Sequence, residues 1–577
     1  MRTNYYSALA RTRLVRRNRI SAKETEAPTP PPDSKLELAT AELKNSAASA
    51  RQERASWLPS LTEIVFVSVL AWLFLLGAGP TALLGDGDTG WHIRTGEHIL
   101  ATRSFPTQDL FSFSRAGDTW YAWEWLSGVL LAAAHKMGGL AGVVLLAGVV
   151  IAATSAVVFR HMLSRGANVV VAILVMLVAG SASTIHWLAR PHIFSYLLLA
   201  IAVWWLEADR RRPTRWVFGL AGLSIVWTNI HGGFGALLAT IGAYLAGSVI
   251  VALWTPRGER NWAEAKRYAL LLGLCLAASL INPYTYRLHQ HIFAYLRSDF
   301  ILNHVQEFRA PDFRGWGMRY FELLLLAGLA CVPGLIRRRD VSMALLLLLW
   351  AHAALTSARH ILLYVVVAAP IVAEELSRLW DEAAERGVAW LKTLQEVARD
   401  YGAGHYGTAA RPAVGWAVPL AVVAAGVVLL TGQHHERLRA EFPKLRFPVD
   451  AVQAAEGQLA GRKIFTSDQW GDYLIYRYYP DLKVFIDGRS DFYGEDIAQQ
   501  YLRASHSHHE WEKILDRWGF DLALLPVEWP LATTIKTHPD WKVKYDDGKA
   551  LLLERTGAPR GENAAALRAG GPRSSGS

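Results

Sequence analysis

Long apolar runs recur along this chain and constrain its fold more than any other feature. The longer ones measure roughly 17 to 22 residues, the length that an α-helix needs to cross the hydrocarbon core of a bilayer. Hydrophobic residues make up 52% of the chain and charged residues 19%, a composition unusual for a soluble protein. Hydropathy places about eleven spans, at 64–84, 140–159, 168–185, 193–208, 216–228, 234–254, 268–281, 320–336, 341–355, 361–374 and 414–431. The predicted fold class is an α-helical polytopic membrane protein.

Basic residues give a formal net charge of +10, and most of them lie in short loops between the apolar runs. Loops of this kind stay on the cytoplasmic side of a membrane. Arginines at 210–212, 215 and 337–339 fall in alternate loops, which predicts a cytoplasmic N-terminus and an outward C-terminal region in a bacterial inner membrane. Topology explains this charge better than nucleic-acid binding does, so we expect no nucleic-acid partner.

Four regions follow from this reading. Residues 1–56, which are basic and rich in proline, predict a disordered cytoplasmic arm. Residues 57–432 form the predicted transmembrane domain, 433–556 a periplasmic α/β domain, and 557–577 a disordered tail. Cys275 and Cys331 lie inside apolar runs, so we expect them to pack there and not to form a disulfide framework.

One apolar stretch, 120–136, is short and carries Glu124 near its start. Counting it as a span would invert every later loop. We therefore predict an interfacial helix on the outer leaflet, with Trp120, Trp123 and Trp125 at the level of the lipid headgroups.

The first outward loop, 85–124, is rich in groups that can do chemistry. Asp86 and Asp88 follow directly on the first span, where a carboxylate is costly unless it has a partner or a function. The alternative is an ordinary turn in which Asp88 or Thr89 caps a helix. The same loop also carries His92, Arg94, Glu97, His98 and Asp109.

Polar turns also lie at the outer ends of later spans. Arg190, Arg287 and Arg359 occur there, and the arginine fork suits two-point contact with phosphate. Each could instead extend to a lipid headgroup, while the neighbouring histidines cap helix ends. Their gathering on one face favours a shared polar cavity, which would also receive His186, His192, His231, His289 and His291. No metal motif with fixed ligand spacing occurs.

This layout resembles the GT-C superfamily of membrane glycosyltransferases, which includes protein mannosyltransferases and the aminoarabinose transferases that modify lipid A. Asp86 and Asp88 fall where that superfamily has its first-loop acidic motif, and the segment 123–137 falls where it has an interfacial helix. The chain is more closely similar to bacterial members that carry GWHIRTGE, DLFSFS and EWL elements. It departs from the lipid A transferases because its interfacial helix opens with AWEWLSG.

The resemblance implies transfer of a sugar from a polyprenyl-phosphate carrier to an extracytoplasmic glycan, lipid or protein, with membrane lipids as further partners. It implies Asp86 as general base and Asp88 as a second carboxylate or as ligand of a divalent cation, Mg²⁺ or Mn²⁺. Arg190, Arg287 and Arg359 would bind the lipid phosphate. Further substrate-binding residues would be His92, Arg94, Glu97, His192 and His231, and Trp91 and Trp187 could stack on a sugar.

Beyond the last span the composition becomes that of a soluble α/β domain. We expect strands at 463–466, 483–487 and 521–525, helices at 469–478 and 496–518, and a hairpin of 541–545 with 550–554. Asp487, Arg489 and Asp491 would emerge from the end of the second strand, where α/β sheets often bind ligands. The alternative is a local Asp487–Arg489 ion pair that orders the turn.

Two other functions compete with glycosyl transfer. A transporter or flippase of lipid-linked glycans would also place charges in a membrane protein, but usually with internal repeats and midplane charges. An inactive GT-C-like scaffold for envelope assembly is the second.

Overall fold

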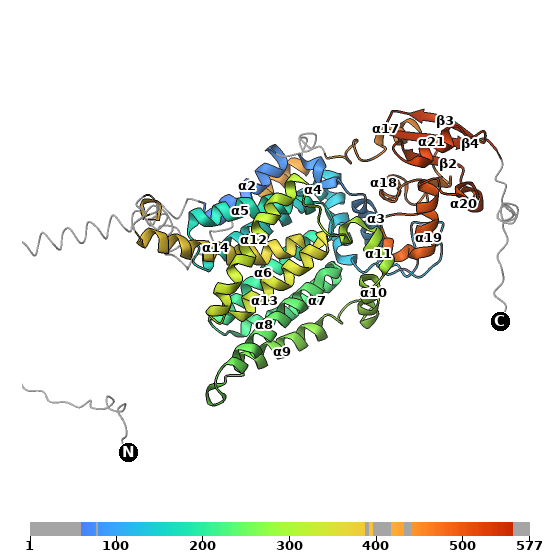
Figure 1. The fold of residues 1–577 in the computed structure, drawn as a ribbon. Helices are drawn as coiled ribbons and strands as arrows, with labels where there is room; N and C mark the ends of the chain where they lie inside the picture. Colours follow the sequence, from blue (N-terminus) through green and yellow to red (C-terminus); the bar gives the residue numbers. More distant parts are fainter. Residues whose placement is uncertain are drawn as a thin grey trace, which may run out of the picture. The chain divides into compact units, whose positions relative to one another are not determined.

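A computed structural model describes residues 59–76, 79–386, 390, 392–395, 417–431 and 440–557. The predicted arm at 1–56 and the tail beyond 557 lie outside these residues. The described chain is mostly helical, with a small sheet near its C-terminal end (Figure 1). The described residues belong to one compact unit.

A helix occupies each of the predicted apolar segments. These helices are α2 (Leu61–Ala71, continued by a π-helical turn Trp72–Leu76), α4 (Trp125–Ser164), α5 (Val169–Ser183), α6 (His192–Arg211), α7 (Gly219–Ile230), α8 (Gly235–Trp254), α9 (Ala263–Ala278), α12 (Trp316–Arg337), α13 (Val341–Thr356), α14 (Ile361–Glu385) and α16 (Ala417–Thr431).

Within the described ranges, six helical segments are long and apolar enough to cross a membrane. They are Trp125–Ser164, Val169–His186, His192–Arg211, Gly232–Trp254, Gly317–Arg337 and Ala358–Glu385. Large apolar side chains such as Leu177 and Leu326 are exposed on these helices, as expected of a surface that contacts lipid. The chain is a membrane protein, and its count of eleven spans stays a prediction.

The helix α4 changes direction at Gly138 and Gly139, whose backbone angles are not helical. The residues before this break form a separate helical stretch, as the sequence predicted, but it begins at Trp125 and not at Trp120. Two tryptophans of this region make contacts within the protein. Trp120 is buried beside Phe111, and the indole nitrogen of Trp123 donates to Asp491, because the C-terminal part of the chain packs on this segment.

Ion pairs join the helices at the end opposite to the first loop. Arg165 contacts Glu207 of α6 at 3.2 Å and Glu374 of α14 at 2.6 Å, and Arg210 contacts Asp340 at 2.6 Å. The helix α6 runs from His192 to Arg211, so its two ends are separated by about 30 Å. The arginine-rich turns and the polar turns of the predicted outer face therefore lie at opposite ends of the helices.

The C-terminal part, residues 440–557, contains a four-stranded sheet in the order β1-β2-β4-β3. The strand β1 (Ile464–Phe465) is parallel to β2 (Leu522–Pro526), while β4 (Ala550–Arg555) is antiparallel to both β2 and β3 (Trp541–Asp546). Its helices are α17 (Val449–Ala454), α18 (Asp468–Tyr478), α19 (Ser490–Ser505), α20 (Trp511–Trp518) and α21 (Pro530–Lys536).

Two predictions for this part need correction. The expected helix 496–518 is two helices, because Ser507 and Glu510 between α19 and α20 adopt positive φ. The expected strand 483–487 does not join the sheet. Instead Val484 forms a single parallel bridge to Ser112 of the first loop, with hydrogen bonds between Val484 and the backbone of Phe111 and Phe113.

The first loop lies against the C-terminal part through α3 (Asp88–Thr102), which packs on both α4 and α18 (Figure 1). A buried ion pair between Asp109 and Arg489 joins them further along the loop. Short helices α10 (Tyr286–Leu296) and α11 (Asp299–His304) complete the same end of the molecule. The polar residues of the first loop are thereby enclosed between the helical bundle and the C-terminal part.

Candidate functional site

A cavity of about 940 Å³ lies where these parts meet, close to the upper end of the range for small-molecule sites. Its walls come from the first loop, the turns before α6 and α8, the segment 292–309, the turn before α14, and the segment 486–491. Of the residues predicted from the sequence, it is lined by Asp86, Asp88, Trp91, His92, His186, Arg190, His192, His231, Arg359, Asp487, Arg489 and Asp491.

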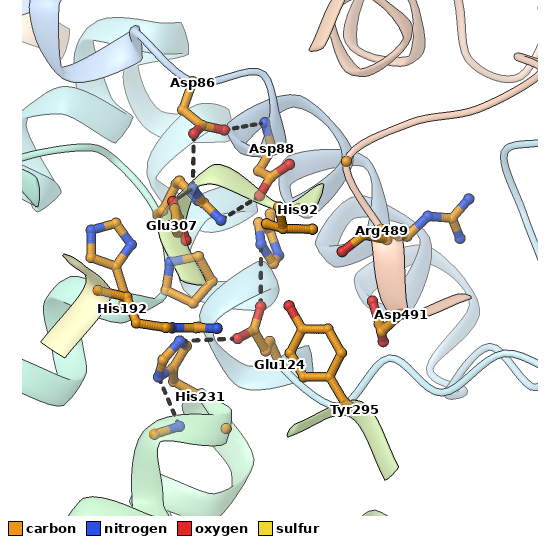
Figure 2. A pocket seen from close by; sticks show the side chains of 18 of the residues that line it. Asp86, Asp88, His92, Glu124, His192, His231, Tyr295, Glu307, Arg489 and Asp491 are labelled. Atoms are coloured by element: carbon orange, nitrogen blue, oxygen red, sulfur yellow. Dashed lines mark hydrogen bonds and ion pairs between the residues drawn. The ribbon is translucent and has the colours of Figure 1, made fainter. Parts of the chain in front are cut away.

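Arg190 is the centre of an acidic cluster in one wall. Its guanidinium lies 2.8 Å from Asp86 Oδ2, 2.6 Å from Asp88 Oδ2 and 2.6 Å from Glu307 Oε1 (Figure 2). The sequence prediction missed Glu307, which lies in the short 3₁₀-helix Gln306–Phe308. Three carboxylates fix the orientation of one cation in this wall.

Backbone contacts hold the first loop against the turn that carries Arg190. The amide of Ala189 donates to the carbonyl of Leu83, and the Thr89 hydroxyl donates to the carbonyl of Ala189 at 3.0 Å. Asp88 begins α3, and its own amide donates to Asp86 Oδ1 at 3.0 Å. A turn and a helix start are therefore present, but neither Asp88 nor Thr89 caps the helix, whose N-cap is Gly87. The turn places both carboxylates at Arg190.

Burial and charge act against each other in this cluster. Burial raises the pKa of Asp88 to about 7, although the charge of Arg190 favours the ionised form. The positive charge of Arg190 is the main reason that the pKa of Glu307 lies well below its ordinary value. Burial acts to lower the pKa of Arg190, but Asp86, Asp88 and Glu307 outweigh it and raise that pKa, so Arg190 stays charged.

Glu124 forms a second polar centre on the cavity wall. Its Oε2 lies 3.3 Å from His92 Nε2, and its Oε1 lies 3.4 Å from His231 Nε2 (Figure 2). Burial raises the pKa of Glu124 to about 8 and keeps the pKa of both histidines well below its ordinary value. We noted Glu124 only as the charge that opens an apolar helix. The rule that singled out Asp86, the cost of a carboxylate at a membrane boundary, also applies to it.

Arg359 is the second cavity arginine, placed by the 3₁₀-helix Ala358–His360. Its guanidinium packs over the ring of Phe308 at 4.4 Å from the centroid. Within the described part of the chain, no carboxylate lies at ion-pair distance from it. Unlike Arg190, it presents its charge without a direct acidic partner.

Several predicted site residues do not line this cavity. Arg287 is exposed on α10, so the shared cavity holds two of the three expected arginines. Arg94 pairs with Glu97 at 2.5 Å, and Glu97 also contacts His135 at 3.1 Å on another side of α3. Trp187 packs edge-on against Trp72. On α3, Arg94 and Glu97 lie on a different face of the helix from His92, because successive side chains point in different directions around a helix axis.

The C-terminal part supplies another wall. The carboxylate of Asp491 accepts hydrogen bonds from His291 at 2.8 Å and Trp123 at 3.2 Å. Burial acts to raise the pKa of Asp491, but these hydrogen bonds outweigh it and hold that pKa below its ordinary value. In Figure 2 the guanidinium of Arg489 points away from the other labelled groups, into its ion pairs with Asp487 and Asp109.

The residues present do not fit the predicted divalent cation well. Among the described residues no group of three histidine, cysteine, aspartate or glutamate side chains could hold a metal ion. Asp88 Oδ1 is buried without a partner, but Asp86, Asp88 and Glu307 converge on Arg190. The guanidinium of Arg190 already occupies the point where a shared cation would bind. We therefore derive no step of the proposed reaction through a metal ion.

No protein-family model matches the chain, and neither does any curated protein. Solved structures do. The apo oligosaccharyltransferase of Archaeoglobus fulgidus aligns with a TM-score of 0.51 and 12% identity, over 81% of this chain and 69% of that one. A structure of the archaeal oligosaccharyltransferase AglB from Archaeoglobus fulgidus, in complex with an inhibitory peptide and a dolichol-phosphate, aligns with a TM-score of 0.52 and 11% identity, over 85% of this chain and 73% of that one.

The chain has a GT-C fold. The resemblance that the first loop and the interfacial helix indicated is confirmed at this level. At such identities the alignment shows the fold alone.

Proposed function

We propose that this protein is a membrane glycosyltransferase that moves a sugar from a polyprenyl-phosphate carrier to an extracytoplasmic acceptor. The observation that supports this most is the pair of arginines in one cavity, Arg190 fixed by three carboxylates and Arg359 without one. A phosphate needs cationic donors in fixed positions, and arginine supplies them without a proton transfer.

The two arginines suit different tasks. Arg359 can donate hydrogen bonds to a phosphate oxygen without breaking an ion pair, so we propose that it binds the phosphate of the carrier. Arg190 lies deeper in the acidic cluster, and Asp86, Asp88 and Glu307 orient it. We assign Asp86 and Asp88 to this positioning, because both oxygens of Asp86 already accept hydrogen bonds, one from Arg190 and one from the Asp88 amide. His92, His192 and His231 remain proposed contacts for sugar hydroxyls.

The reaction exchanges one bond at the anomeric carbon for another. The acceptor oxygen forms a bond to that carbon, the bond from the carbon to the phosphate oxygen breaks, and its electron pair stays on the phosphate. Arginine side chains aimed at the phosphate stabilise the charge that develops there. The acceptor loses a proton, which a carboxylate of the cavity must take.

The fold comparison supports a lipid-linked donor. AglB of Archaeoglobus fulgidus, which shares this fold, was obtained in complex with a dolichol-phosphate and a peptide. Apolar side chains of α10, α11 and α14 also line this cavity, among them Leu296, Phe300 and Leu363, and they suit the hydrocarbon chain of a related carrier.

We propose the orientation that the basic loops predict, with the N-terminus cytoplasmic, eleven spans, and the cavity and the predicted domain 433–556 on the periplasmic side of a bacterial inner membrane. The arginine-rich turns at the far ends of the helices support this. Sugars outside the cytoplasm then come from lipid carriers, which agrees with the proposed donor.

The test uses the full chain in vesicles with a polyprenyl-phosphate-linked sugar, followed by release of free carrier phosphate. We expect release by the wild type and a loss of about 100-fold in R359A and in Arg190→Lys, which keeps the charge but misplaces its donors. Arg314→Ala is the control, because Arg314 is exposed in the loop before α12. Movement of the intact donor across the vesicle membrane without release of carrier phosphate would instead indicate a flippase. If the protein neither releases carrier phosphate nor moves the donor, an inactive scaffold is indicated.

A further inference from the structure

A residue that exchanges a proton with the acceptor should face the cavity and should not be held in a strong ion pair. Asp86, Asp88 and Glu307 are bound to Arg190, and Asp491 accepts hydrogen bonds from His291 and Trp123. Asp468, which also lines the cavity, accepts a hydrogen bond from the Gln469 amide at 2.9 Å. Glu124 differs, because among the described residues its ion-pair contacts are with two histidines whose pKa burial holds well below its ordinary value.

A hydrogen-bond chain sets the tautomer of His231. The backbone amide of Gly233 donates to His231 Nδ1 at 2.9 Å, so this nitrogen carries no proton. In neutral imidazole the proton must then be on Nε2, the atom that faces Glu124. Ser195 Oγ, which lies 2.7 Å from Nδ1, accepts from the Trp227 indole at 2.7 Å and can donate its own proton to Nδ1.

The position of Glu124 is fixed from several sides. It is the N-cap residue of α4, and its carbonyl accepts the Ser127 hydroxyl at 2.7 Å. Trp123, the residue before it, is held by Asp491 and packs against Gly232, where a Cβ would overlap the indole ring. These contacts fix the backbone that carries the Glu124 side chain.

We propose that Glu124 is the general base that deprotonates the acceptor, and that His231 is the positioning residue that directs it. This inference rests on the proposed function. The acceptor O–H passes its proton to Glu124, the acceptor oxygen bonds to the anomeric carbon, and the electron pair of the broken bond leaves on the carrier phosphate. The proton on Glu124 then returns to the departing phosphate or to water.

The charges around Glu124 decide the pH at which it ionises. Burial raises its pKa most, Arg190 and Arg359 lower it, and Asp491 and Asp88 raise it, while His92 and His231 are neutral neighbours. The resulting pKa of about 8 is that of a strong base near physiological pH. The rate of transfer is therefore expected to rise with pH up to about 8.

The experiment follows hydrolysis of the polyprenyl-phosphate-linked sugar, with water as the acceptor, as release of free sugar between pH 6 and 9. We expect Glu124→Gln to lower kcat at least about 100-fold, to leave KM for the donor unchanged, and to remove the rise with pH. Glu495→Gln, an exposed carboxylate on α19, is the matched control. S195A tests the positioning chain, and we expect a smaller loss of kcat with a shifted pH profile.

The possible outcomes distinguish a failure of the Glu124 assignment from a failure of the proposed function. Full turnover by Glu124→Gln in a preparation whose wild type is active overturns the role of Glu124 and leaves the proposed function standing. A wild type that releases neither sugar nor carrier phosphate at any pH overturns the proposed function and this inference together. A raised KM with unchanged kcat in Glu124→Gln would make it a binding residue and would also overturn the proposal.

Discussion

Arg489 of the C-terminal part and Asp109 of the first loop form an ion pair of 2.8 Å, with side chains 1% and 0% exposed. Arg489 also binds Asp487 and packs over the rings of Phe111 and Trp120. Asp109 in turn accepts the amides of Phe111 and Ser112. This pair joins two segments far apart in sequence and holds the wall that closes the cavity.

Asp109→Ala should destabilise the protein by about 2 to 4 kcal/mol, because it removes one of two carboxylate partners of the buried Arg489 and leaves the amides of Phe111 and Ser112 without their acceptor. The measurement is thermal unfolding of the purified protein in detergent. Asp496→Ala serves as the control, since it breaks the exposed pair with Arg115, and should cost about 1 kcal/mol or less. Equal unfolding temperatures for the two variants would show that the buried pair does not hold the parts together.

Gly488→Ala should reduce transfer at least about 10-fold with little change in expression. A Cβ at this position would overlap Asp88 Oδ1 and approach Asp472 Oδ2 to 2.8 Å, so Asp88 would have to leave its contact with Arg190. Gly242→Ala on α8 is the control, because a Cβ there meets nothing within 4 Å. Transfer rates of both variants in vesicles decide the question, and unchanged activity in Gly488→Ala would mean that Asp88 does not position Arg190.

Patterns within short sequence segments predicted the helices and turns that form within those segments. The apolar runs predicted helices because hydrogen bonds within one segment satisfy its backbone in lipid. The helix expected at 469–478 is α18, and Ser467 Oγ caps its start by accepting the Trp470 amide at 3.2 Å. The ion pair between Asp487 and Arg489, which we weighed as an alternative, is also present, because two residues in one turn can meet without help from the rest of the fold.

Contacts between distant segments could not be predicted in the same way. The hydrogen bond from Arg190 to Asp86 spans 104 residues, and that from Trp123 to Asp491 spans 368. Packing of helices and docking of the C-terminal part determine both, and neither leaves a periodic pattern. Glu307 was missed for this reason, and Arg287 was included although its position on α10 turns it outward. Glu124 carried a local signal, since it is a carboxylate at a membrane boundary, but its histidine partners are distant in sequence.

The pKa of Asp88 predicts how stability depends on pH. Burial raises it from the ordinary value of 3.8 to about 7, so the folded protein binds more protons than the unfolded chain between these values. Stability should therefore fall as pH rises from about 4 to 7. Asp88→Asn should flatten this dependence, whereas Asp118→Asn, at an exposed position, should not. Unfolding temperatures across this range provide the measurement, and parallel curves for wild type and Asp88→Asn would contradict the prediction.

Removal of divalent cations should leave transfer activity nearly unchanged. Arg190 already contacts Asp86, Asp88 and Glu307 and supplies the positive charge that a shared cation would bring. The measurement compares transfer before and after treatment with a chelator, and then with added Mg²⁺ or Mn²⁺. In Arg190→Ala the three carboxylates lose their common partner, and added cations should then bind more tightly than in the wild type, which calorimetry can detect. Loss of wild-type activity on chelation, with recovery on adding either ion, would show that a cation displaces Arg190 from this cluster.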